Sequence, residues 1–132
     1  MTKQYNIILE QKKNSFSKNK DYFRLPVYKA SVDLIKQFWN STQKSPMTAK
    51  LGLLKDTEQE MIQMIYNIYK SAICVDKIDT LTKTLLLAKH IQLELRIYFD
   101  LGFLSKNGFT IVSSKSEDVV RQLTGWLKSY NH

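Results

Sequence analysis

Apolar residues recur every three to four positions through most of the chain after residue 25, and this periodicity is the strongest constraint on the fold. A helix places residues spaced by 3.6 on one face, whereas a half-buried strand needs alternation by two. The 132 residues include only four glycines and two prolines, too few for the tight turns of an all-β sandwich or barrel. The sequence therefore predicts a single all-α domain.

Four segments share the helical period, and helices are expected at residues 26–41, 48–72, about 77–101 and 106–130. Pro26 suits a first helical turn, and Asp76 or Asp79 can cap the third helix. Gly125 lies inside the fourth helix at a cost of about 1 kcal/mol relative to Ala, which predicts a close helix contact there. Because the connections are short, we expect an antiparallel up-and-down four-helix bundle over residues 25–132.

The third helix carries two apolar stripes. The broad one comprises Ile78, Leu81, Leu85, Ala88, Gln92, Leu95 and Phe99. The second comprises Leu86, Leu93 and Ile97, roughly opposite the direction of Ile91 and Tyr98. A helix with two apolar stripes buries more than one side. We expect the second stripe to be an interface between copies of the chain; the alternative is that a long loop or the N-terminal segment covers it.

The net charge of +8 is distributed unevenly. Residues 1–24 carry six basic and two acidic side chains, so they hold +4 and leave +4 for the rest. This segment is polar and lacks apolar periodicity, which is typical of a flexible arm. The arm either contacts phosphates or only aids solubility. In the first case the contacts would come from Lys12, Lys13, Lys18 and Lys20.

Two pairs of basic residues have heptad spacing in the predicted bundle. Lys89 and Arg96 share one side of the third helix, and Arg121 and Lys128 share one side of the fourth. On neighbouring helices they would form a positive ridge, and a cyclic oligomer would multiply it. The alternative is ordinary helix solvation with local pairs such as Arg96–Asp100.

The sequence offers little for catalysis or for a metal. The histidines are His90 and His132, and no Cys/His pair has zinc spacing. Glu-x-x-His carboxylate motifs, a glycine-rich phosphate loop and a serine elbow are also lacking. We therefore expect a protein that is not an enzyme and has no metal or cofactor. His90 is interpreted as a solvated or interface residue, with a phosphate contact as the alternative.

The single cysteine and the hydropathy pattern indicate the compartment. Cys74 lies in an apolar stretch and is expected to be a reduced core thiol. No stretch approaches the roughly 18 uncharged apolar residues of a spanning helix. Ile7-Ile8-Leu9 is too short for the apolar region of a signal peptide. We expect a cytoplasmic protein without a membrane partner.

The fourth helix resembles a known family. The run Val120-Arg121-Gln122-Leu123-Thr124-Gly125-Trp126-Leu127-Lys128-Ser129 is similar to the closing signature of bacterial four-helix-bundle proteins of the accessory variability determinant type. These occur with diversity-generating retroelements and are related to proteins encoded in intervening sequences of ribosomal RNA genes. Leu25-Pro26-Val27-Tyr28-Lys29-Ala30-Ser31-Val32-Asp33-Leu34 resembles the family's first helix, and Ile68-Tyr69-Lys70-Ser71-Ala72 with Asp76-Lys77 its second-helix end.

This resemblance, which spans about residues 25–130, implies a homopentamer that forms a basic barrel. It also implies binding of RNA or DNA with little sequence preference, association with a reverse transcriptase, and no enzymatic activity. From the sequence we thus expect a non-enzymatic, oligomeric nucleic-acid-binding accessory protein. The alternative is an oligomeric protein-interaction scaffold whose charge is incidental.

Overall fold

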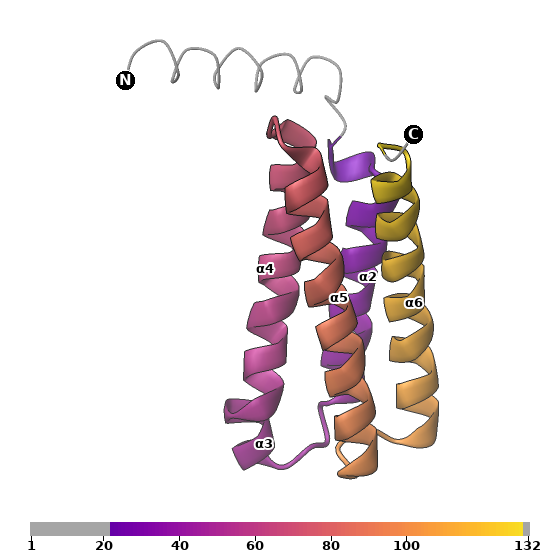
Figure 1. Ribbon diagram of the computed structural model, residues 1–132. Coiled ribbons are helices and arrows are strands. Elements are labelled where there is room, and N and C mark those ends of the chain that lie inside the picture. Colours follow the sequence, from indigo (N-terminus) through magenta and orange to yellow (C-terminus); the bar gives the residue numbers. More distant parts are fainter. Residues whose placement is uncertain (1–21, 131–132) are drawn as a thin grey trace.

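The computed structural model describes residues 22–130, and Figure 1 shows how they fold. Its elements are the 3-10 turn η1 (Tyr22–Arg24) and the helices α2 (Pro26–Ser41), α3 (Met47–Leu51), α4 (Leu53–Ile73), α5 (Lys77–Asp100) and α6 (Lys106–Lys128). No strand occurs within residues 22–130. The prediction of an all-α four-helix bundle is confirmed.

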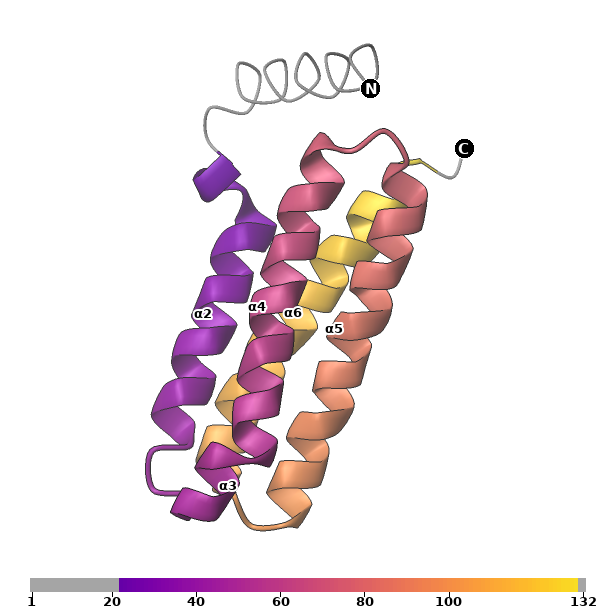
Figure 2. The same ribbon diagram turned by 90° about the vertical axis from the view of Figure 1, so that its left-hand side faces the viewer.

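The four long helices α2, α4, α5 and α6 alternate in direction, so that each runs antiparallel to the one before it in the chain. Figures 1 and 2 show them as a bundle in which α2 and α5 lie diagonally across from each other. Helix α2 packs against α4 and α6, and α5 packs against the same two. The side chains of Lys115 and Asp33 form an ion pair of 2.7 Å between α6 and α2. From the packing of the helices, both α4 and α6 are neighbours of α5.

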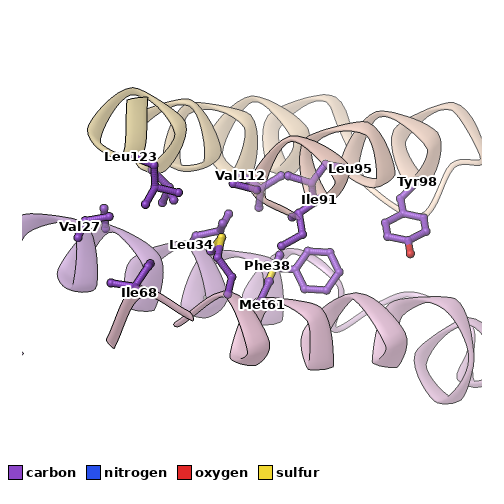
Figure 3. Packing of buried hydrophobic residues seen from close by; sticks show 14 of the residues in the cluster. Val27, Leu34, Phe38, Met61, Ile68, Ile91, Leu95, Tyr98, Val112 and Leu123 are labelled. Carbon is purple, nitrogen blue, oxygen red and sulfur yellow. The ribbon is translucent and has the colours of Figure 1, made fainter. Parts of the chain in front are cut away.

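One apolar core fills the space between the helices. Figure 3 shows side chains from all four converging there, including Leu34, Met61, Ile91 and Val112. Each of these is almost completely buried. Ile91 and Tyr98 point into this core from α5, although the sequence did not place them in the broad stripe. Ile78, placed in the broad stripe from the sequence, is instead largely exposed.

Polar side chains cap the starts of α5 and α6 and the end of α4. The Asp76 carboxylate accepts a hydrogen bond from the amide of Asp79 and so caps α5, and the Ser105 hydroxyl does the same for α6. At the end of α4, the Lys77 ammonium donates to two carbonyls at 3.0 Å each. A cation there also opposes the negative end of the helix dipole. The turn between α4 and α5 is thus fixed from both sides.

The predicted second helix is divided in two. We expected one helix over residues 48–72, but the backbone of Gly52 (φ −109°, ψ −106°) lies outside the helical range. Helix α3 ends before it and α4 begins after it. Leu51, the last residue of α3 before this break, is exposed. A lone glycine is a weak signal for such a break, because a helix tolerates one at moderate cost.

Three other expectations need correction. Tyr22–Arg24, assigned to the arm, form η1, and Tyr22 is 7% exposed, with its ring in edge contact with Tyr69. The sulfur of Cys74 is half-buried at the α4–α5 turn, 3.3 Å from the hydroxyl of Thr80, so it is no core thiol. A methyl group at Gly125 would meet nothing within 4 Å, which contradicts the predicted helix contact within the subunit.

Two glycine substitutions test the open space at Gly125 and the left-handed backbone at Gly102. Gly125→Ala should raise the free energy of unfolding by about 0.5–1 kcal/mol, because the methyl group has room and alanine restricts the unfolded chain. Gly102→Ala should lower it by about 1 kcal/mol, since Gly102 adopts φ +83°. Urea denaturation of both variants measures the difference. A destabilised Gly125→Ala would mean that something packs closely on this position.

Candidate nucleic-acid interface

The two predicted basic pairs lie on neighbouring helices. Lys89 and Arg96 are exposed on α5, and Arg121 and Lys128 are exposed on α6. Because α5 and α6 pack side by side and antiparallel (Figure 1), both pairs belong to one half of the bundle. The other predicted basic residues, Lys12, Lys13, Lys18 and Lys20, lie outside the described residues.

Two of these four cations already have acidic partners. The guanidinium of Arg96 lies 3.2 Å from the carboxylate of Asp100, as the alternative reading anticipated, and that of Arg121 lies 2.7 Å from Asp118. Burial alone would raise the pKa of Asp118, but hydrogen bonds from Gln122 and Arg121 outweigh it, and the pKa lies below its usual value. Exposed pairs of this kind contribute little to stability. Both arginines can exchange such partners for phosphates.

The second stripe of the third helix is open to solvent in the single chain. Leu86, Leu93 and Ile97 are 64%, 58% and 43% exposed. They lie on the side of α5 opposite the core residues Ile91 and Tyr98. No loop within residues 22–130 covers these three side chains. This excludes one of the alternatives given above, a covering loop, for the described part of the chain.

The basic residues of α5 border this apolar stripe. Lys89 follows Leu86 by three positions and precedes Leu93 by four, which makes all three neighbours on the helix surface. Arg96 follows Leu93 by three. A molecule seated on the stripe would therefore touch the stems of both cations while their charged ends remain at its edge.

Two aromatic side chains of α5 and α6, Tyr98 and Trp126, have limited access to solvent. Tyr98 is buried, and its hydroxyl donates to the carbonyl of Leu53 at 2.9 Å and contacts the hydroxyl of Thr57. The indole nitrogen of Trp126 donates to Tyr130 at 3.2 Å, and its ring is half-buried. Tyr98 therefore has a structural role in the core.

The structure also brings together three residues that sequence reasoning did not group. Glu60 of α4 lies opposite His90 and Glu94 of α5. The Nε2 atom of His90 is 3.5 Å from Glu60 Oε2 and 3.7 Å from Glu94 Oε2. The four-residue spacing of His90 and Glu94 was visible in the sequence, but the register of α4 against α5 was not.

The carboxyl group of Glu94 in this cluster resists ionisation. Burial raises the pKa of Glu94 to about 8, and the neighbouring Glu60 carboxyl and the charge of Asp56 act in the same direction. The nearby polar side chain of Thr57 partly opposes this increase. Burial also raises the pKa of the adjacent Tyr98. The cluster therefore holds a proton at neutral pH in the absence of another cation.

Comparisons with known proteins returned no match: no family model, no curated protein and no solved structure is similar to this chain. None of the helices within residues 22–130 is long and apolar enough to cross a membrane.

The raised pKa predicts how stability depends on pH. Unfolded Glu94 ionises near 4.5, whereas the folded protein keeps the proton until about pH 8. The folded state thus binds more protons between these values, and the free energy of unfolding should fall as the pH rises from 5 to 9. Glu94→Gln should flatten this decline, whereas Glu117→Gln, at an exposed position, should not. Urea melts in buffer with EDTA measure it, and an unchanged slope in Glu94→Gln would refute the assignment.

Proposed function

We propose that this chain is a non-enzymatic, oligomeric protein that binds RNA or DNA through basic residues repeated around the assembly. The observation that carries the proposal is the exposed stripe of Leu86, Leu93 and Ile97, bordered on the same helix by Lys89 and Arg96. The resemblance to accessory variability determinants supports a homopentamer that assists the reverse transcriptase of a diversity-generating retroelement.

The occupant of the stripe that fits best is a second copy of the chain. Three large aliphatic side chains in line on one helix are an arrangement that soluble monomers rarely leave open. Removing them from water stabilises an assembly by roughly 25 cal/mol for each Å² buried. The uncharged centre with cations at its edge also matches the usual anatomy of interfaces between proteins.

Assembly is what would make the charge effective. Residues 25–132 carry a net charge of only +4, since the remaining +4 belongs to residues 1–24. A ring repeats Lys89, Arg96, Arg121 and Lys128 in every subunit, so that the field at its surface grows with the number of copies. Contacts with phosphates through these cations would carry little sequence preference.

A negative charge introduced on the stripe should therefore dissociate the assembly. Leu93→Glu should reduce the mass measured by light scattering to that of one chain, because a carboxylate buried at an interface lacks a partner. The circular dichroism spectrum should remain helical, since Leu93 is exposed within the subunit. Lys36→Glu, on the exposed side of α2, is the control and should leave the mass unchanged. A wild-type protein that is monomeric at all concentrations would contradict the proposal.

Nucleic-acid binding should depend strongly on salt and on the α6 pair. Six or more phosphate contacts imply about a 10³-fold loss of affinity between 50 and 200 mM salt. Arg121→Glu combined with Lys128→Glu should abolish retention of a labelled RNA or DNA in gel-shift assays at low salt. The matched control is Lys29→Glu with Lys36→Glu, which makes the same charge change at the same spacing on α2.

The outcome also separates the two functional classes. If the wild-type oligomer retains no RNA or DNA at low salt, nucleic-acid binding is refuted and the protein-interaction scaffold is the better description. If both double variants weaken binding equally, binding depends on overall charge and not on the α5–α6 surface.

A further inference from the structure

We propose that Glu60, His90 and Glu94 form a binding site for a divalent transition-metal ion, with Zn²⁺ as the ion that fits best. The site lies where α4 and α5 face each other, apart from the basic residues of α6. One imidazole nitrogen and one oxygen from each carboxylate lie within 4.8 Å of one another.

Two of the three separations between the donor atoms are close to those of a coordination sphere. Zinc binds imidazole nitrogen and carboxylate oxygen at about 2.0–2.2 Å, so two ligands at a tetrahedral angle are roughly 3.4 Å apart. The His90 nitrogen lies 3.5 and 3.7 Å from the nearest oxygens of Glu60 and Glu94. These distances are long for hydrogen bonds, yet they need only small side-chain adjustments to enclose an ion.

A second observation points to a missing ligand. The Oε2 atom of Glu60 and the Oε1 atom of Glu94 are both buried and have no hydrogen-bond partner. Buried carboxylate oxygens without partners are costly, and proteins rarely retain them without an ion or a bound water. Within residues 22–130, neither glutamate forms an ion pair with a lysine or an arginine.

The charge and chemistry of the donors select the class of ion. When they coordinate a metal, two carboxylates and a neutral imidazole together carry −2, which a divalent cation neutralises. Imidazole suits zinc and its neighbours, whereas Mg²⁺ and Ca²⁺ prefer sites made only of oxygen. Three protein ligands leave one tetrahedral position open to water.

The ligands lie on rigid elements. His90 and Glu94 are one turn apart on α5, and Glu60 is in the middle of α4. The Thr57 side chain of α4 lies near Glu94, and its hydroxyl contacts the hydroxyl of the buried Tyr98. Partners beside a metal ligand help to fix its orientation. A bound ion would thus join α4 to α5 near the middle of both helices.

The test is calorimetric titration of the EDTA-treated and dialysed full-length protein with ZnCl₂. We expect one Zn²⁺ per chain and a higher melting temperature with zinc. Co²⁺ should give the visible absorption of a four-coordinate site at the same stoichiometry. MgCl₂ and CaCl₂ at equal concentration should produce neither effect.

Variants connect the binding to these residues. His90→Ala and Glu94→Gln should each lower the zinc affinity at least about 100-fold, because even partners that only orient a ligand account for about 10–100-fold. Glu117→Gln removes an exposed carboxylate from α6 and should bind as the wild type does. His90 is 54% exposed, so His90→Ala retains the fold and carries the test if Glu94→Gln does not.

Two results would overturn the proposal. One is the absence of zinc binding up to millimolar concentration. The other is binding that persists in His90→Ala and Glu94→Gln at wild-type affinity, since the ion would then be held elsewhere. Equal affinity for Mg²⁺ would refute the choice of a transition metal.

Discussion

The register between α4 and α5 is the constraint on which the remaining features depend. At one end, the buried hydroxyl of Tyr98 donates to the carbonyl of Leu53 at the first residue of α4. At the other end, the Lys77 ammonium holds the last carbonyls of α4. Both bonds satisfy polar groups that would otherwise be costly to bury. Together they set which residues of α4 lie opposite His90 and Glu94.

The helix break at Gly52 lies at the end of α4 where Tyr98 fixes the register between α4 and α5. Helix α4 starts anew at Leu53, directly after the break, and the carbonyl oxygen of Leu53 accepts the hydrogen bond from the Tyr98 hydroxyl. The apolar period continues across residues 48–72, so the pattern alone predicted one helix. The helix break that the sequence did not predict thus lies beside the buried hydrogen bond between Tyr98 and Leu53.

Periodicity was sufficient for the fold and for the direction of most side chains. It separated Leu86, Leu93 and Ile97 from the core, because the sides of a helix follow from 3.6 residues per turn. The start of α2 was predicted instead from Pro26, which is its first residue. Periodicity failed where a result depends on contacts between helices. Gly125 was expected to be in contact but is open, and Glu60 was not associated with His90, thirty residues later. No period within one helix contains such information.

Helix α5 links the two proposals physically. His90 follows Leu86 by four positions and precedes Leu93 by three, so it borders the exposed stripe on the side away from Lys89. A second copy seated on the stripe would cover one face of the imidazole whose Nε2 faces Glu60 and Glu94. An ion that fixes this ring therefore changes the surface offered to the second copy, and assembly changes access to the ion. By linkage the effect must be reciprocal: if zinc strengthens assembly, assembly strengthens zinc binding by the same factor.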